Sequence, residues 1–289
     1  MHEILSQTLP LVIAVFLSTA MFSLGLDLTT RQIIDPLRDR RLVAISLLAN
    51  VVLVPLAALG IAGVIPMDAG LRTGFLLYAF AAGVESGPKL VQLAKGNAAF
   101  AVGLLAIQIV ITVVFLPVVI TIVNPDAHVS RASVLFKLLL VVVLPIAIGL
   151  YIKARRDALA IRLSPVMHRI AVFLLAVVFA QLIYIHFDAL LAVPSAALLA
   201  ALLLFAIAFA IGYVLGGPKT ENRRALAIMT FARNASISMM IAGQVFTQEP
   251  EVLVMITVLT VLAIVLAVPA IVSFRRTTLT HEAAQSLPT

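Results

Sequence analysis

The 289-residue chain contains no cysteine and no tryptophan, and only 11% of its residues are charged. The lack of cysteine excludes disulfides, thiol nucleophiles and cysteine-ligated metal sites. The lack of tryptophan means that any aromatic belt at a membrane surface depends on 4 Tyr and 15 Phe. Because about a quarter of the residues in a soluble globular protein are charged, this chain has too little polar surface to face water on all sides.

Hydrophobic residues make up 63% of the chain, and its mean hydropathy is +1.17. We therefore expect an all-α integral membrane protein, with the lipid bilayer as its surroundings. A membrane helix takes about 20 apolar residues, so at most about ten spans fit, with no room for a soluble catalytic or nucleotide-binding domain. No phosphate loop, metal-ligand spacing or nucleophile motif is present. We predict one transmembrane domain over residues 1–289, with no enzyme activity and no catalytic residues.

Apolar runs between turn residues predict nine spans. Their approximate ranges are 8–26, 42–65, 70–94, 97–123, 133–152, 165–186, 190–215, 224–246 and 251–274. With the N-terminus outside, fifteen of the 20 basic residues fall on the inner side, and Arg72, Arg131 and Lys137 fall on the outer side. Basic loops face the cytoplasm, so the net charge of +7 sets orientation and does not indicate nucleic acid. We expect a multi-pass protein of the plasma (inner) membrane, with a cytoplasmic C-terminus.

Two of the nine spans contain polar interruptions. Residues 82–89 include Gly83, Glu85, Gly87 and Pro88, and residues 230–238 hold a second polar cluster. Each interrupted span is the third of a series of four, and the single span 133–152 between the series reverses the direction of the second. This order is typical of two inverted repeats whose broken helices cross. The alternative is that the glycines and the proline only make a packing kink.

Three ionisable side chains fall within the interrupted spans, and their charges sum to +1. They are Glu85, Lys89 and Arg233. An unpaired charge at this depth costs several kcal/mol, so partners or water are expected. A Glu85–Lys89 pair at i,i+4 spacing would leave Arg233 in excess, which favours a carboxylate, a sulfonate or a similar organic anion as substrate. The alternative is a structural triad that holds the two broken helices together.

The chain resembles the bile acid:sodium symporter family. The resemblance rests on Gly-Leu-Asp-Leu at residues 25–28, on the broken segment 82–97 ending in Leu-Ala-Lys-Gly-Asn, and on Arg233-Asn234. It implies a ten-helix fold, or nine helices when the first is missing, as here. It also implies a core domain (approximately 42–123 and 190–274) and a panel domain (approximately 8–26 and 133–186). The substrate would bind between them, beside the crossing.

The resemblance also implies two coupled sodium ions, but several residues depart from the sodium pattern. Gly87-Pro88 replaces a Ser-Asn pair, and Met229 and Arg233 replace a Glu and a Gln. The neighbouring positions Ala101 and Leu105 are apolar, so we expect one sodium site to be lost. Asn50 agrees with the family, and it lies five residues before Pro55.

These comparisons give two candidate sets. The predicted substrate-binding residues are Glu85, Ser86, Lys89, Arg233, Asn234 and Ser236. The predicted ion-coupling residues are Asn50, Glu85, Arg233 and Asn234. We expect Gln108 and Gln181 to make hydrogen bonds between helices. No cofactor and no metal site are assigned, apart from sodium as a coupling ion.

The leading hypothesis is a secondary active transporter of a small organic anion, in which Lys89 and Arg233 replace one or both coupling ions. Transport would then be sodium-independent, or proton-linked through Glu85. The alternatives are an uncoupled anion facilitator or exchanger, and a non-transporting membrane receptor.

Overall fold

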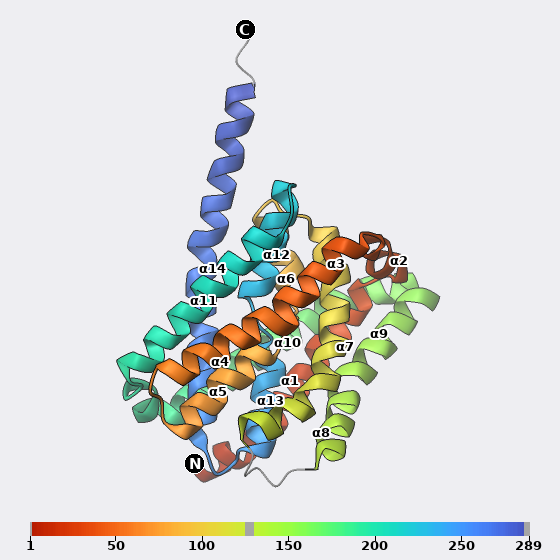
Figure 1. Ribbon diagram of the computed structural model, residues 1–289. Coiled ribbons are helices and arrows are strands. Elements are labelled where there is room, and N and C mark those ends of the chain that lie inside the picture. The colour runs from red at the N-terminus through yellow and green to blue at the C-terminus, as the bar shows by residue number, and fades with distance from the viewer. Residues whose placement is uncertain (1, 125–129, 286–289) are drawn as a thin grey trace.

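The protein is an all-helical bundle (Figure 1). A computed structural model describes residues 2–124 and 130–285, and it describes their side chains except for residues 36–37 and 277–285. The described helices are α1 (His2–Asp27), α2 (Thr30–Ile34), η1 (Asp35–Arg38), α3 (Arg40–Leu47), η2 (Leu48–Leu53), α4 (Val54–Val64), α5 (Ala69–Phe80), α6 (Gly87–Leu93), α7 (Ala98–Val123), α8 (Arg131–Leu138), η3 (Leu139–Val143), α9 (Leu144–Arg155), α10 (Asp157–Leu191), α11 (Ser195–Leu215), α12 (Thr220–Phe231), α13 (Ala235–Val245) and α14 (Pro250–Gln285). No strand occurs among these residues.

Eight helical segments of the described chain are long and apolar enough to cross a membrane. The pair α12–α13 is among them, as are the continuous segments Arg40–Val64 and Arg131–Arg155. The remaining predicted span, 70–94, corresponds to α5 and α6, which residues 81–86 separate. This interruption leaves α5 with 12 residues and α6 with 7, and each is shorter than a membrane helix.

Helix α10 is longer than the sequence predicted. The predicted span covers 165–186, but the helix begins earlier, at Asp157, and continues to Leu191. Arg162, one of the fifteen basic residues expected on the inner side and placed by the predicted spans in a loop, therefore lies within a helix. Non-helical dihedral angles at His186 kink the helix at the predicted end of the span. Pro165 does not mark the beginning of the span, although a proline is favoured in the first turn of a helix. Here it lies inside the helix.

Two segments of π-helix precede prolines. The segment η2 is followed by Pro55 near the start of α4, and η3 is followed by Pro145 near the start of α9. Proline has no N–H group, and its ring collides with the carbonyl four residues earlier. A wider turn relieves this collision, and π-turns inside helices are frequent at functional sites. In η2 the wider turn contains Asn50.

The helices differ in their packing partners and in how deeply they are buried. Helix α1 packs mainly against α9 and α10, whereas α12 packs against α11 and α5 packs against α14 and α4. The α12–α13 segment is the most enclosed, because 94% of its most apolar window is buried, compared with 22% in α10. The broken pair α12–α13 therefore lies in the interior of the bundle, and α10 faces outward.

Helices α1 and α9 approach closely at two glycines. A Cβ atom added to Gly25 would lie 2.4 Å from the carbonyl oxygen of Ile146, and one added to Gly149 would lie 2.6 Å from that of Phe22. Only glycine allows this contact between backbones, as small residues do in other membrane helix pairs. The Gly-Leu-Asp-Leu motif thus has a packing role at its glycine.

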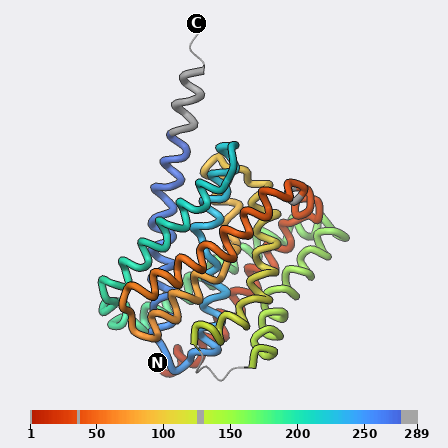
Figure 2. Tube along the Cα trace, viewed as in Figure 1, coloured from red at the N-terminus to blue at the C-terminus, as the bar shows by residue number. Residues whose placement is uncertain are grey.

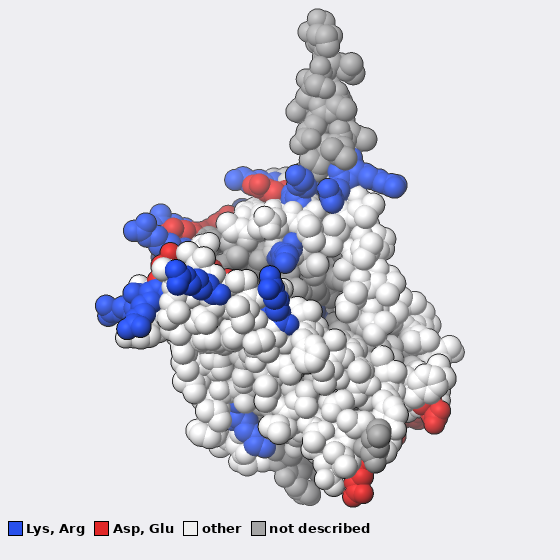
Figure 3. All heavy atoms as spheres, turned by 180° about the vertical axis from the view of Figure 1, so that it is seen from behind, with Lys and Arg blue, Asp and Glu red and all other residues white. Residues whose placement is uncertain are grey.

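The two ends of the bundle differ in charge. The chain begins at one end and α14 leaves at the other (Figures 1 and 2), as expected for an odd number of crossings. In the view of Figure 3, most Lys and Arg side chains gather toward the end where α14 leaves, whereas a few acidic side chains lie toward the opposite end. We call these the basic end and the N-terminal end.

Replacing Gly25 by Ala should destabilise the protein. The added Cβ overlaps a backbone oxygen that cannot move without shifting α9, and overpacking of this kind costs about 1–3 kcal/mol. Thermal unfolding in detergent measures the effect. Gly60→Ala is the matched control, because no atom lies within 4 Å of its added Cβ, and alanine is favoured over glycine inside a helix. Equal melting temperatures for the two variants would contradict this account of the contact.

Candidate functional site

The interruption between α5 and α6 is a short stretch of backbone, residues 81–86, that is not helical. It begins at Ala81, and Gly83 adopts a φ of +90°, a conformation that L side chains rarely take. A Cβ atom on Gly83 would also lie 3.0 Å from Cβ of Gln108 in α7. Glycine is therefore required here both for the turn and for the close approach of α7.

The second interruption, between α12 and α13, meets the first. The backbone N–H of Asn234 donates to the carbonyl of Ala81 at 2.8 Å, and its side-chain Nδ2 donates to the carbonyl of Gly83 at 2.7 Å. The Asn234 Oδ1 accepts from the N–H of Ile237 at 3.0 Å and so caps α13. One asparagine thus joins the two broken helices and begins the second half-helix.

Further carbonyls at and beside the two interruptions also accept hydrogen bonds from side chains. Thr112 of α7 donates through Oγ1 to the carbonyl of Ala82 at 2.9 Å. Ser238 of α13 donates to the carbonyl of Asn234 at 3.0 Å and lies 3.4 Å from that of Leu77. Because an unsatisfied backbone group costs several kcal/mol inside a bilayer, these bonds explain how opened backbone is tolerated there. The packing-kink alternative does not account for hydrogen bonds between the two interruptions.

Arg233 lies next to this crossing and is only 2% exposed. Its Nη1 donates to Asn50 Oδ1 and its Nη2 to the Asn50 backbone carbonyl, both at 3.2 Å. Within the described chain no carboxylate forms an ion pair with Arg233, and its Nε has no hydrogen-bond partner. The guanidinium is therefore held by neutral oxygen atoms, which are the kind of ligand that also binds coupling cations at broken helices.

The position of Pro55 explains why the Asn50 carbonyl is available. In η2 the N–H of Val54 donates to the carbonyl of Ala49, five residues earlier. The next π-type bond would run from residue 55 to the Asn50 carbonyl, but proline has no N–H. The Asn50 carbonyl thus accepts from Arg233 instead. The amide Nδ2 of Asn50 donates to Ser46 and to Thr230, at 2.9 and 3.2 Å.

Glu85 lies at the other side of the crossing. Its carboxyl group is close to the Ser236 hydroxyl and the Asn234 side chain, and its Oε1 is buried without a hydrogen-bond partner. Glu85 as a residue is only partly buried. The structure therefore brings Glu85, Asn234 and Ser236 together in one group and Asn50 with Arg233 in a second.

Two predicted site residues do not join either group. Ser86 and Lys89 are exposed, and Glu85 and Lys89 form no ion pair, although both belong to the described part of the chain. The expected i,i+4 pair is absent because Glu85 lies in the interruption, whereas Lys89 lies on α6, so the two residues do not share a helix. The structural-triad alternative fails for the same reason, since Lys89 does not take part.

Several polar residues near the crossing were not predicted as site residues. Thr112 and Thr230 each bond to a site residue or to the opened backbone, and a threonine inside an apolar run gives no distinctive signal. Gln108 was expected to bond between helices, but both polar atoms of its buried amide lack a partner. That expectation was wrong for Gln108 and is confirmed for Gln181, whose Nε2 donates to Thr8 of α1 at 3.3 Å.

The side chain of Met229, in α12, packs against the beginning of α6. A Cβ atom on Gly87 would lie 2.6 Å from its sulfur, and Met229 is fully buried. An apolar side chain therefore occupies the position at which the resemblance implies a carboxylate. It cannot ligate a sodium ion there.

Comparison with known proteins agrees with the geometry. Residues 14–193 match the family described as the Sodium Bile acid symporter family, which confirms the resemblance indicated by the sequence motifs. The matched region contains the first interruption and ends before α12. The family is one of transporters, not enzymes.

A curated relative gives the same indication. The chain is 30% identical over 142 residues to a Bacillus subtilis (strain 168) protein named "Uncharacterized sodium-dependent transporter YocS". The match covers 49% of this chain and 44% of the relative, so less than half of the relative's length is compared.

Replacing Asn234 by Ala should weaken the contact between the two interruptions and leave only the backbone hydrogen bond to the Ala81 carbonyl. The Gly83 carbonyl loses its donor and α13 loses its cap, and each loss costs about 1–2 kcal/mol. We expect a lower melting temperature than for Thr260→Val, a control that removes one bond within a single helix. If both variants melt like the wild type, the Asn234 bonds do not hold the crossing together.

Proposed function

Because the chain belongs to the sodium bile acid symporter family, we propose that it is a secondary active transporter of a small organic anion. The observation that carries this proposal is the contact between the two interrupted helices, through Asn234 and the carbonyls of Ala81 and Gly83. Two broken helices that meet at membrane depth are typical of transporters whose substrate binds at the repeat interface. Inverted repeats themselves remain part of the proposal.

Transport would occur by movement of a core (approximately 42–123 and 190–274) against a panel (approximately 8–26 and 133–186). The packing supports this division, because α1 packs mainly against α9 and α10, and the interrupted helices pack against α7, α11 and α14. The two parts also touch where α1 packs against α13. A moving interface at this contact would open and close access to the crossing.

The charges near the crossing favour an anionic substrate. The guanidinium of Arg233 is occupied by Asn50, so Lys89 is the exposed cation on the half-helix that follows the first interruption. We propose that Lys89, Ser86 and Ser236 contact a carboxylate or sulfonate. Glu85 would repel such an anion unless it is protonated, which would link transport to protons.

The proposed coupling differs from that of a sodium symporter. Arg233 places a permanent positive charge on two Asn50 oxygens that a sodium ion could otherwise use, and Met229 offers no oxygen. Sodium-independent or proton-linked transport follows from these replacements. The relative's name, which specifies sodium dependence, favours the opposite behaviour, so the coupling ion needs a direct test.

An uncoupled facilitator or exchanger is the second candidate. With a fixed cation in place of a coupling ion, only the gradients of the exchanged substrates would drive transport. This candidate therefore predicts that the substrate does not accumulate against its own gradient. A membrane receptor that keeps the transporter fold is the third candidate, and it predicts substrate binding without transport.

The orientation is also a proposal. The gathering of Lys and Arg at the basic end (Figure 3) supports a cytoplasmic position for that end, because basic residues are enriched on the cytoplasmic side of membrane proteins. The N-terminal end would then face outward from the plasma (inner) membrane.

Uptake into proteoliposomes should not require sodium. We would first find a transported anion among cholate, pyruvate and an aryl sulfonate by thermal stabilisation of the purified protein, and then measure uptake in sodium and in choline buffers. We expect similar rates in both. An uptake rate that is about tenfold or more lower in choline than in sodium, equivalent to about 1.4 kcal/mol, would contradict sodium-independent transport.

Arg233→Gln serves as the companion variant in this assay. Glutamine keeps a donor for Asn50 but removes the charge, so transport should stop or become sodium-dependent. Unchanged transport together with unchanged stability would remove Arg233 from the mechanism.

A further inference from the structure

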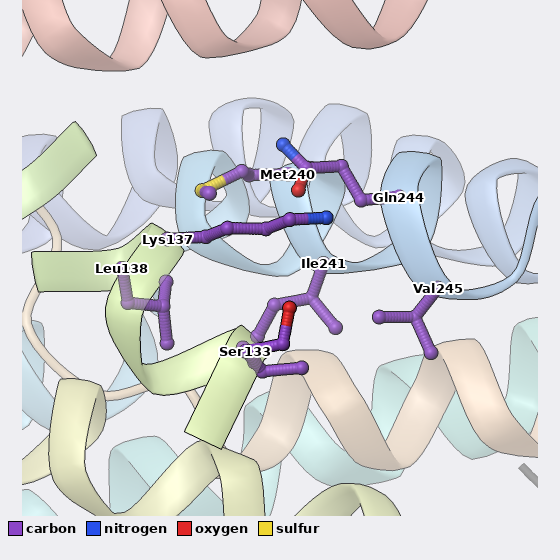
Figure 4. A pocket seen from close by; sticks show the side chains of 8 residues that line it. Ser133, Lys137, Leu138, Met240, Ile241, Gln244 and Val245 are labelled. Carbon is purple, nitrogen blue, oxygen red and sulfur yellow. The ribbon is translucent and has the colours of Figure 1, made fainter. Parts of the chain in front are cut away.

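The cavity between α8 and α13 is too small for an organic ligand (Figure 4). Its volume is about 30 Å³, and one water molecule needs about 10–15 Å³ of such space. The residues that line it include Lys137 and Gln244, whose side chains lie beside each other. This cavity suits a few water molecules, so a larger ligand does not bind there.

The surface of the basic end, in contrast, gathers cations where α11, α12 and α14 meet. The turn between α11 and α12 lies beside α14 there (Figure 1), and Lys and Arg side chains gather where α14 leaves the bundle (Figure 3). Three cations of this region are wholly or partly exposed, namely Lys219, Arg223 and Arg275. None of the three forms an ion pair with another residue of the described chain. Their charge is therefore available to an anionic partner.

Glycines fold the beginning of α12 back onto the end of α11. A Cβ atom added to Gly216 would lie 2.4 Å from Cα of Arg223, and Gly217 adopts a φ of +78°. A Cβ atom added to Gly212 would lie 2.6 Å from a backbone oxygen of α12, so the two helices touch backbone to backbone. Residues with a side chain do not allow so tight a turn. The turn brings Arg223 of α12 over the ring of Tyr213 in α11.

Two contacts hold the guanidinium of Arg223 at the surface. Its Nε donates to the carbonyl of Gly217 at 2.6 Å, and its Cζ lies 5.9 Å from the centre of the Tyr213 ring. Tyr213 and the adjacent Val214 are exposed, and on a membrane helix such apolar surface faces lipid. Tyrosine is favoured where the hydrocarbon region meets the headgroups. Arg223 therefore lies at the depth of the lipid headgroups.

Phe274 fixes the end of α14 beside Tyr213. Its ring stacks on those of Phe209 and Tyr213, with ring centroids 5.5 and 6.0 Å apart and interplanar angles of 16° and 12°. Phe274 is buried in this contact, whereas the next residue, Arg275, is exposed. A cation from α14 is thus held close to the one from α12.

Like charges also adjoin each other at the beginning of α12. The N–H of Arg223 donates to the carbonyl of Lys219 at 3.1 Å, and residues at this spacing of four are neighbours on a helix surface. Two cations at this spacing repel each other, which an anion between them would relieve. Glu221 is the acidic residue in the first turn of α12. It lies two residues from Arg223, a spacing at which side chains do not face each other.

We propose that the basic end binds an anionic phospholipid, whose phosphate group lies on three cations and whose acyl chains lie along the exposed end of α11. The cations are Lys219, Arg223 and Arg275, and the end of α11 is Tyr213 and Val214; we call these five residues the lipid site. Guanidinium groups match the geometry of phosphate oxygens. A lipid with a choline group carries a positive charge that the same three cations repel, so the site selects a negative headgroup. The lipid site is separate from the crossing, and it does not depend on which solute is transported.

Competition between lipids tests the lipid site. A fluorescent phosphatidylglycerol would be bound to the purified protein in detergent and then displaced by unlabelled phosphatidylglycerol, phosphatidylcholine or inorganic phosphate. We expect phosphatidylglycerol to displace the label at a concentration about tenfold or more below that of either competitor. Equal displacement by phosphatidylcholine would show that the charges play no part, and equal displacement by inorganic phosphate would show an anion site without a lipid. Either result would overturn the proposal.

Single variants place the binding on the protein. Arg223→Gln should weaken the binding of phosphatidylglycerol about fivefold, because each basic residue near an anionic lipid contributes about that much to the attraction. Arg155→Gln is the matched control, since Arg155 is an exposed cation at the end of α9, a helix that packs mainly against α1. It should leave the affinity unchanged. Equal affinities of Arg223→Gln and the wild type would contradict the lipid site.

A double variant keeps the test decisive if Arg223→Gln does not fold, because that variant also loses its bond to Gly217. Lys219 and Arg275 are both exposed, so replacing both by Gln should leave the melting temperature unchanged. The affinity for phosphatidylglycerol should fall about tenfold or more. If this double variant binds the lipid as tightly as the wild type, the cations of the lipid site do not hold the headgroup.

Discussion

The structure depends on the need to satisfy opened backbone inside a bilayer. Residues 81–86 leave the helix, and in lipid no water is present to bond the freed carbonyls. Asn234 and Thr112 supply the donors. Because Asn234 itself lies in the second interruption, neither broken helix is stable without the other. The enclosure of α12–α13 in the bundle follows from this mutual requirement.

The same need explains the position of the buried cation. Pro55 deprives the Asn50 carbonyl of its donor, and the wide turn of η2 presents both Asn50 oxygens to the interior. A positive group is the natural partner of two oxygen dipoles in a medium of low dielectric constant. In this chain the positive group belongs to Arg233 and is covalently attached, so it cannot leave with a substrate. A coupling ion, in contrast, must bind and dissociate in every transport cycle.

Composition and hydropathy were sufficient to predict the helical membrane fold and both interruptions, because glycine, proline and charged residues in apolar runs are rare and costly. Pairing within the site was predicted less well. The prediction of an ion pair between Glu85 and Lys89 was wrong, because i,i+4 spacing brings two side chains together only within one helix, and the interruption ends the helix between them. Asn50 was identified only as one candidate, and its contact with Arg233 depends on tertiary packing between η2 and the loop after α12. The unpartnered amide of Gln108 has no sequence signal, because an isolated glutamine in an apolar run more often bonds to another helix.

The central claim is that Arg233 occupies the place of a coupling cation beside Asn50. Equilibrium binding of radioactive sodium to the purified protein tests it most directly, with wild type and Arg233→Gln compared at equal ionic strength. The account predicts no saturable sodium binding by the wild type and its appearance in the variant. Saturable binding by the wild type that persists unchanged in Arg233→Gln would contradict the claim.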